Sequence, residues 1–271
     1  MKLDIRGASY HLESKGKGEP ILFLHGFTGS GETWKEAVKG LEEEASIILL
    51  DLPGHGKTVL PEMPSRYSME EACRDLAKIL DSLKLEKVNV VGYSMGGRAA
   101  LSFACLYPNR VNKLVLESAS PGLDQMADRE ARKQQDDKLA DFIEAEGMKA
   151  FVDKWESIPL FASQRTLPAP LQNEIRKQRL QNKPNELAQS LREMGTGSQP
   201  SWWYRLSTLS NETLLLVGEE DKKFCIIAEN MEKKLPNAKK IIFSGAGHAI
   251  HVEQPKKFGT IIKEFLLKGQ I

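Results

Sequence analysis

Three side chains in this sequence could together carry out chemistry at a serine: Ser94, Asp221 and His248. A serine hydroxyl is a weak nucleophile and a weak base until an imidazole takes its proton, and that imidazole needs a carboxylate to fix its tautomer. Each of the three follows an apolar run that predicts a strand. Taken singly, each would be an ordinary loop residue, but together they predict a catalytic triad in the order serine, aspartate, histidine. Glu219 and Glu220 are the alternative acids.

The segment around Ser94 predicts how its hydroxyl is presented. The pattern Gly92-x-Ser94-x-Gly96 lies after a predicted strand at residues 87–91 and before a predicted helix at residues 95–107. This arrangement is typical of a nucleophile elbow, a strained turn in which glycines let the strand and the helix approach without a Cβ clash. An isolated match would predict only a solvated turn serine, whereas the flanking strand and helix favour the elbow.

Other residues close to these three in the sequence have more than one possible role. Arg98 is four residues after Ser94 and lies on the same face of the predicted helix. Its guanidinium could bind a substrate carboxylate through two hydrogen bonds, or its side chain could extend to solvent. Of the histidines, we expect His25 to be structural and His251 to lie at the rim or on the surface.

The composition excludes several classes of function. A chain of 271 residues with 41% hydrophobic content can bury the core of one large α/β domain. Its 38 basic and 37 acidic residues give a net charge of +1, which argues against a nucleic acid or an anionic membrane as partner. The segment at residues 56–58 imitates a phosphate loop, but a Walker A motif needs glycine where Asp51 stands.

The sequence also predicts a cytoplasmic location. Cys73, Cys105 and Cys225 are odd in number and unrelated in spacing, which favours reduced thiols over a disulfide framework or a metal site. The first residues lack the apolar core of a signal peptide, and no run approaches the roughly 20 apolar residues of a membrane span.

Apolar runs alternate with helical patterns and predict an α/β fold with a mostly parallel central sheet. The expected strands are residues 20–24 and 46–50, both buried, then 87–91, 111–116, 213–217 and 240–243, with a peripheral antiparallel strand or pair within residues 3–12. Helices are expected at residues 32–41, 226–235 and 257–267. A capping box of Ser68 with Glu71 predicts the start of another helix that ends near Leu83.

The middle of the chain is more highly charged than the rest and has a helical pattern. Nearly half of residues 124–156 are charged, with apolar residues at helical spacing, and five prolines divide the region up to residue 206 into several short helices. We interpret residues 120–206 as a helical cap over the Ser94 side of the sheet, inserted between core segments at residues 1–119 and 207–271. An independent helical interaction domain is the alternative, which the return of core-type strands disfavours.

Stretches along the whole chain resemble known proteins. The core resembles the α/β-hydrolase superfamily, and the chain more narrowly resembles the family of 2-succinyl-6-hydroxy-2,4-cyclohexadiene-1-carboxylate (SHCHC) synthases of menaquinone (vitamin K2) biosynthesis. The stretches that carry this resemblance are Gly92-Tyr93-Ser94-Met95-Gly96-Gly97-Arg98, residues 117–123, Trp155 with residues 159–161, residues 179–182, residues 195–200 and Gly245-Ala246-Gly247-His248.

The resemblance implies a carbon–oxygen lyase on an α/β-hydrolase fold. Its substrate would be the tricarboxylate 2-succinyl-5-enolpyruvyl-6-hydroxy-3-cyclohexene-1-carboxylate, from which pyruvate is eliminated. Ser94, activated by His248 and Asp221, would remove the ring proton next to the succinyl ketone. The backbone N–H groups of Phe27 and Met95 would form the oxyanion hole that holds the enolate oxygen.

The same resemblance implies a set of substrate-binding residues and no cofactor. Contacts to the carboxylates or the ring would come from Tyr93, Arg98, Trp155, Arg179 and one of Arg129 or Arg132. Neither a metal nor an organic cofactor is required, because the oxyanion hole does the electrophilic work. The expected partner is the small-molecule substrate alone, and the sequence leaves the oligomeric state open.

Two alternatives share these residues. A serine esterase or a carbon–carbon bond hydrolase acting on a carboxylate-bearing substrate would use the same triad and cap. A non-catalytic protein of this fold that binds a small ligand would not need an intact triad, so the presence of all three residues disfavours it.

Overall fold

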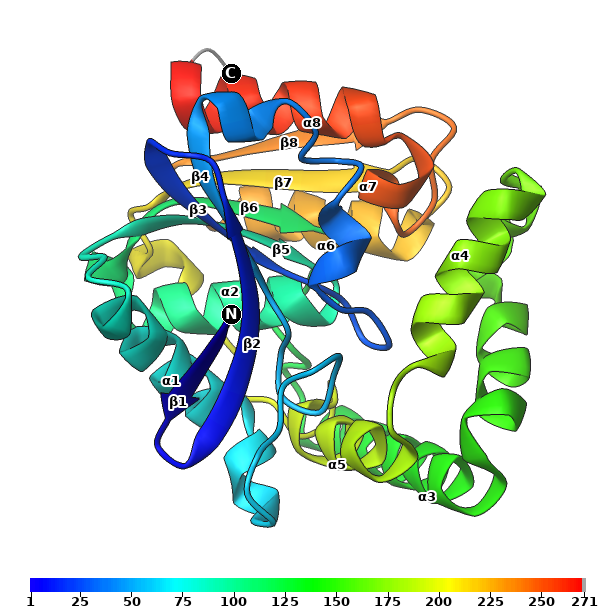
Figure 1. The fold of residues 1–271 in the computed structure, drawn as a ribbon. Helices are drawn as coiled ribbons and strands as arrows, with labels where there is room; N and C mark the ends of the chain where they lie inside the picture. Colours follow the sequence, from blue (N-terminus) through cyan, green and yellow to red (C-terminus); the bar gives the residue numbers. More distant parts are fainter. Residues whose placement is uncertain (270–271) are drawn as a thin grey trace.

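A central sheet of eight strands organises the computed structural model, which describes residues 1–269 (Figure 1). The strands are β1 Lys2–Ile5, β2 Ala8–Lys15, β3 Glu19–Leu24, β4 Ala45–Leu50, β5 Val88–Tyr93, β6 Val111–Glu117, β7 Glu212–Gly218 and β8 Ala238–Phe243. Their order is β1-β2-β4-β3-β5-β6-β7-β8, and only the β1–β2 and β2–β4 pairs are antiparallel. The predicted mostly parallel sheet is confirmed, and residues 3–12 contribute a pair of strands.

The two faces of the sheet are covered because alternate residues of each buried strand point to opposite sides. Helices α1 Met69–Ser82, α2 Met95–Leu106 and α6 Lys222–Glu232 cover the face to which Leu22 and Val90 belong. Helix α8 Pro255–Lys263 and the segment after β3 cover the face to which Phe23 and Val91 belong (Figure 1). Both faces are therefore apolar, as the continuous hydrophobic runs indicate.

Between β6 and β7 the chain forms a separate group of helices. These are α3 Met126–Ser157, the 3₁₀ segment η5 Pro159–Thr166, α4 Ala169–Leu180 and α5 Pro184–Met194. Helices α3 and α5 pack on each other around a small apolar core of their own that includes Ile143, Phe151 and Leu187. The limits of the cap at residues 120 and 206 stay a prediction.

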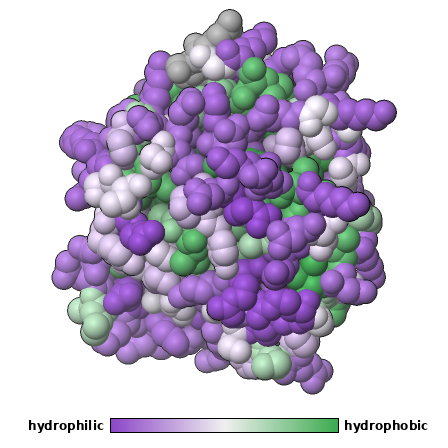
Figure 2. Space-filling model, turned by 90° about the vertical axis from the view of Figure 1, so that its left-hand side faces the viewer, coloured by the Kyte–Doolittle hydropathy of each residue, from purple (hydrophilic) through white to green (hydrophobic). Residues whose placement is uncertain are grey.

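The structure has several helices in this region, as predicted, but the first break is not at a proline. Helix α3, Met126–Ser157, consists of two helices that meet in a kink at Gly147, whose backbone is not helical, with φ 74° and ψ 177°. No helix within residues 1–269 is both long and apolar enough to cross a membrane. The face drawn in Figure 2 is mostly hydrophilic with scattered apolar areas.

Two other predicted helices need correction. Residues 32–41 do not form an α-helix but two 3₁₀ turns, η1 Gly31–Trp34 and η2 Leu41–Glu43. The segment is short and ends at Gly40, which has a positive φ of 79°. Too few helical hydrogen bonds can form here to offset the free-energy cost of helix nucleation. Helix α6 begins at Lys222, four residues before the predicted start, because the Asp221 side chain caps it by accepting the N–H of Phe224.

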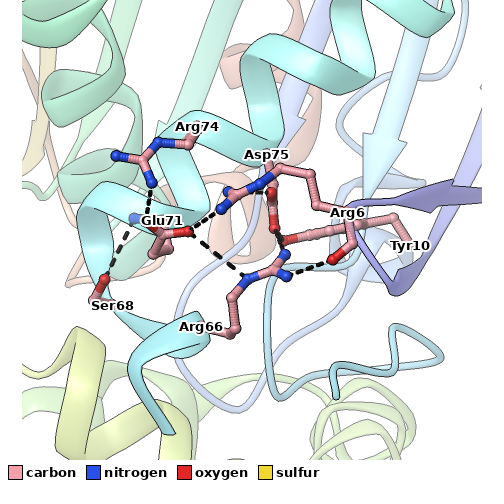
Figure 3. A network of polar contacts seen from close by, with 7 residues as sticks. All are labelled: Arg6, Tyr10, Arg66, Ser68, Glu71, Arg74 and Asp75. Carbon is pink, nitrogen blue, oxygen red and sulfur yellow. Dashed lines mark hydrogen bonds and ion pairs between the residues drawn. The ribbon is translucent and has the colours of Figure 1, made fainter. Parts of the chain in front are cut away.

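The predicted capping box at the start of α1 is only half formed (Figure 3). The Ser68 hydroxyl accepts the backbone N–H of Glu71 at 3.3 Å. The Glu71 carboxylate does not return the bond; it pairs with Arg6 at 2.7 Å and with Arg74. A stronger partner than the backbone N–H of Ser68 has therefore taken the carboxylate.

Asp75 ties the β1–β2 hairpin to α1 (Figure 3). Its carboxylate, which is fully buried, accepts hydrogen bonds from Arg66 at 2.6 Å, Arg6 at 2.9 Å and the Tyr10 hydroxyl at 2.9 Å. Burial and the Asp75 charge raise the pKa of Tyr10, so its hydroxyl remains a donor. The polar network thus joins segments that are 65 or more residues apart.

We predict that Asp75→Asn lowers the free energy of unfolding by about 3–5 kcal/mol, because the buried Arg66 guanidinium loses its anion. Urea unfolding monitored by circular dichroism measures this loss. Asp81→Asn is the matched control on the same helix, since Asp81 lies on the surface and should matter far less. An equal loss of unfolding free energy in the two variants would contradict the claim that the Asp75 network stabilises the fold.

Candidate active site

Ser94 stands between the last residue of β5 and the first residue of α2, in a strained backbone with φ 50° and ψ −107°. Its N–H donates to the carbonyl of Glu117 on the neighbouring strand β6 at 2.8 Å. A Cβ at Gly92 would lie 2.4 Å from the Gly96 carbonyl oxygen, and one at Gly96 would lie 2.0 Å from that of Leu24. Both glycines are therefore required for α2 to start this close to the sheet.

The structure brings Ser94, His248 and Asp221 into one chain of hydrogen bonds. His248 Nε2 lies 2.9 Å from Ser94 Oγ, and His248 Nδ1 lies 2.6 Å from Asp221 Oδ2. The three residues follow β5, β8 and β7, whose carboxyl ends meet at one edge of the parallel sheet. Both His248 and Asp221 are buried, which strengthens the bond between them.

Neither alternative acid reaches the imidazole. Glu219 is exposed and accepts hydrogen bonds from the Ser244 hydroxyl and the Gly245 N–H. Glu220 is also exposed, and no bond joins either carboxylate to His248. Asp221 alone can orient the imidazole.

The prediction that His251 lies at the rim or surface was wrong. His251 is 1% exposed, and both its N–H and its Nδ1 contact the Glu117 carboxylate, at 3.0 and 2.9 Å. Its Nε2 lies 3.0 Å from the Thr33 hydroxyl, and Trp34 packs against its ring. A buried acid on another strand holds this histidine inside, which three-residue spacing from His248 did not reveal.

The two predicted oxyanion-hole donors line one cavity with Ser94. No acceptor for the backbone N–H of Phe27 or of Met95 is found among residues 1–269, so both can donate to a bound molecule. His25 supports the Phe27 loop: its Nε2 accepts the Leu52 N–H at 3.0 Å, so its Nδ1–H donates to the Gly26 carbonyl at 2.8 Å. This arrangement fits only a neutral imidazole.

Burial lowers the pKa of His25 to about 4. Burial and the neighbouring His25 together lower the pKa of His55, whose ring packs beside it, to about 3. The Phe27 ring in turn contacts the edge of the His55 ring. Two buried neutral imidazoles therefore support the loop that carries one oxyanion donor.

The cavity at Ser94 has a volume of about 340 Å³ and is walled by the sheet edge on one side and the helices after β6 on the other. Of the predicted site residues, it is lined by Ser94, His248, Phe27, Met95, Tyr93, Arg98, Arg132 and Trp155. Residues that were not predicted as site residues also line it, among them Ser118, Ser190, Leu160, Phe161, Met194 and Phe224. The hydroxyls of Ser118 and Ser190 are buried without a partner among residues 1–269.

Three cationic residues line the same cavity, Arg98, Arg132 and Lys223, together with one acidic residue, Asp124. Arg98 is half-buried and donates to the Met194 carbonyl at 2.7 Å and to Gln199 Oε1 at 2.5 Å. Burial and the nearby charge of Arg132 lower the pKa of Arg98 to about 10, so it remains a cation at neutral pH. Arg132 pairs with Asp136 at 2.8 Å. With the carboxylates of Asp124 and Asp136 counted against Arg98, Arg132 and Lys223, one positive charge remains, which gives the cavity a net attraction for anions.

Two predicted substrate-binding residues do not line this cavity. The Arg179 guanidinium is buried against Glu156 at 3.2 Å and Gln164 at 2.8 Å, with the Phe161 ring below it. Arg129 is half-buried in the first turn of α3 and lies outside the lining residues. Residue type and spacing could not reveal which face of each cap helix turns inward. Among residues 1–269, no group of three or more His, Cys, Asp or Glu side chains could hold a metal ion.

Known proteins match this chain over nearly all of its length. A family described as alpha/beta hydrolase fold matches residues 19–255. A putative 2-succinyl-6-hydroxy-2,4-cyclohexadiene-1-carboxylate synthase of Bacillus subtilis (strain 168) is 47% identical over 96% of this chain and 95% of its own length. The 2-succinyl-6-hydroxy-2,4-cyclohexadiene-1-carboxylate synthase of Citrobacter koseri is 31% identical over 88% of this chain and 90% of its own.

Solved structures also match this chain over nearly all of its length. MenH from S. aureus superposes with a TM-score of 0.91 and 37% identity, covering 97% of this chain and 99% of its own. A thermophilic esterase from Thermogutta terrifontis, solved with malate bound, has a TM-score of 0.85 and 28% identity, covering 100% of this chain and 99% of its own.

The buried neutral histidines predict a loss of stability in mild acid. Unfolding returns His25 and His55 to a pKa near 6.5, so below that pH the unfolded chain binds more protons than the folded one. The free energy of unfolding should therefore fall from pH 7 to pH 5, by up to about 1.4 kcal/mol per pH unit for each histidine. Urea titrations at several pH values measure the slope.

His55→Asn provides the control, because asparagine can still donate to the Pro53 carbonyl but cannot titrate. The variant should take up about one proton fewer on unfolding near pH 5. A stability that stays constant between pH 7 and pH 5 in the wild-type protein would contradict the neutral state of these imidazoles.

Proposed function

Since the chain belongs to the α/β-hydrolase fold family and, within it, to the 2-succinyl-6-hydroxy-2,4-cyclohexadiene-1-carboxylate synthases, we propose that it is a carbon–oxygen lyase of menaquinone biosynthesis. It converts 2-succinyl-5-enolpyruvyl-6-hydroxy-3-cyclohexene-1-carboxylate into the cyclohexadiene and pyruvate. The observation that carries this proposal is the Ser94–His248–Asp221 hydrogen-bond chain at the wall of a cavity that also holds two arginines.

In the proposed mechanism, the triad acts as a base. As the Ser94 oxygen takes the ring proton next to the succinyl ketone, its own proton passes to His248 Nε2, 2.9 Å away. Asp221 stabilises the resulting imidazolium through Nδ1, 2.6 Å away. The electron pair of the broken C–H bond moves into the ketone as an enolate, whose oxygen the Phe27 and Met95 N–H groups would hold.

Collapse of this enolate completes the elimination. Its electron pair moves through the ring and breaks the C–O bond to the enolpyruvyl group, and the released enolpyruvate takes up a proton to become pyruvate. Ser94 keeps the ring proton as its hydroxyl hydrogen, and His248 returns to the neutral imidazole by giving up the proton that enolpyruvate takes up. No acyl group is transferred, so no covalent intermediate forms. The same groups could also transfer an acyl group, so their geometry alone does not distinguish a lyase from an esterase.

The charged cavity suits a substrate with three carboxylates. We assign carboxylate binding to Arg98 and Arg132, and contacts to the ring or succinyl chain to Tyr93 and Trp155, since all four line the cavity with Ser94. A bidentate guanidinium–carboxylate contact is stronger than a neutral hydrogen bond. Arg179 would need to leave Glu156 to take part.

The substrate is the only partner that the proposed reaction requires, and no cofactor enters it. We further propose that the protein works in the cytoplasm. The supporting observation is that its three cysteines are all free thiols in the structure, as a reducing compartment would keep them.

The proposal predicts that the protein releases one pyruvate and one conjugated diene per molecule of the enolpyruvyl tricarboxylate. Diene absorbance and a coupled pyruvate assay follow the two products in the same cuvette. Ser94→Ala should lower both rates together by about 10²–10⁴-fold, since it removes the base, while its melting temperature stays near that of the wild type. Efficient aryl-ester turnover with an acyl-enzyme burst, and no pyruvate, would leave the esterase alternative in its place.

A further inference from the structure

We propose that Glu253 is a positioning residue that holds the backbone on both sides of His248 and links it to the cap through Ser163. The inference rests on the proposed role of His248 as the base. Glu253 is the last residue of the one-turn helix α7, Ile250–Glu253, which follows the His248 loop directly. Its side chain turns back toward that loop.

The carboxylate of Glu253 accepts the N–H groups of both neighbours of His248. The Gly247 N–H donates to Oε2 at 2.6 Å, and the Ala249 N–H donates to Oε1 at 3.3 Å. Charge-assisted bonds of this kind are stronger than bonds between neutral groups. One peptide group before His248 and one after it are thus fixed, which holds the backbone from which the imidazole reaches Asp221 and Ser94.

The same carboxylate also receives a bond from the cap. The Ser163 hydroxyl, in η5, donates to Glu253 Oε1 at 2.9 Å. Ser163 lies so close to the loop that a Cβ at Gly247 would be 2.1 Å from its Oγ. The neighbours Leu160 and Phe161 in η5 line the Ser94 cavity, so the segment that reaches Glu253 is also a wall of the site.

A partly buried carboxylate such as that of Glu253 destabilises the folded protein unless hydrogen bonds satisfy its oxygens. The side chain is partly buried, burial raises its pKa, and no cation pairs with it among residues 1–269. A desolvated carboxylate without a cation is tolerated when hydrogen bonds satisfy its oxygens, and here the donors are the two peptide groups that flank His248 and one cap hydroxyl. Displacement of η5 would therefore change the bonding that holds the His248 loop.

Two readouts test the proposal, and the first does not depend on the substrate. The rate at which a fluorophosphonate labels Ser94 reports how well His248 activates the hydroxyl, whether or not the protein is a lyase. Pyruvate release from the enolpyruvyl tricarboxylate then gives kcat and KM separately. A wild-type protein that is labelled but releases no pyruvate would refute the proposed function. The labelling rates of the wild type and the Glu253 variants would still test the role of Glu253.

Glu253→Gln should slow labelling and lower kcat, each by about 10-fold, because an amide NH₂ then faces a backbone N–H and the loop moves. It should also raise KM about 5-fold, because the moved side chain no longer accepts the Ser163 hydroxyl. Ser163→Ala should raise KM about 5-fold and leave kcat within about twofold, since only the bond to the cap is lost. Thr166→Ala is the control in the same segment: its exposed hydroxyl bonds only to the Ser163 carbonyl, and all parameters should stay within about twofold.

The double variant decides whether Ser163 acts through Glu253. In the Glu253→Gln background, Ser163→Ala should produce no further rise in KM, because the shared bond is already disrupted. Equal KM increases in both backgrounds, or a Glu253→Gln labelling rate within twofold of the wild type, would overturn the proposal. If Glu253→Gln does not fold, Glu253→Asp, whose shorter side chain cannot reach both N–H groups, should show the same slower labelling.

Discussion

The strained backbone of Ser94 is the constraint on which the rest of the site depends. A residue other than glycine at φ 50° and ψ −107° costs on the order of 1–3 kcal/mol, and the surrounding structure must hold it there. The bond from its N–H to Glu117 and the close contacts of Gly92 and Gly96 do so. Because this turn ends β5 and starts α2, Ser94 and Met95 both line the cavity at the sheet edge.

Two acids, the buried Glu117 and the partly buried Glu253, extend this order to the segment that carries His248 and His251. Glu117, whose carbonyl fixes Ser94, uses its carboxylate to hold the N–H and the ring of His251. Glu253 accepts the N–H groups on either side of His248. The serine and the imidazole are thus positioned from strands and a short helix of the core, with one further bond to Glu253 from Ser163 in η5. A desolvated carboxylate destabilises the folded protein unless its oxygens accept hydrogen bonds. The hydrogen bonds of Glu117 and Glu253 therefore favour a single geometry of the triad.

The sequence predicted the parts of this molecule that depend on local pattern. Continuous apolar runs gave the parallel sheet, and the Gly92-x-Ser94-x-Gly96 spacing gave the turn at Ser94. The predictions were wrong where a residue far away in the sequence determines the position of a side chain. Glu117 holds His251 in the interior, and Glu156 holds Arg179 outside the cavity. Charged helices such as those of the cap carry no mark of which arginine faces inward, because a guanidinium can lie in solvent, in a salt bridge or in a site with the same helical spacing.

The most direct test of the central claim is a single-turnover experiment with deuterium at the ring carbon next to the succinyl ketone. If Ser94 and His248 act as a base, the C–D bond must break before pyruvate leaves, and a chemistry-limited step should be slower by about two- to sevenfold for a bond broken in the transition state. The diene and pyruvate should appear at the same reduced rate. A normal rate with the deuterated substrate, together with an acyl-enzyme on Ser94, would contradict the account.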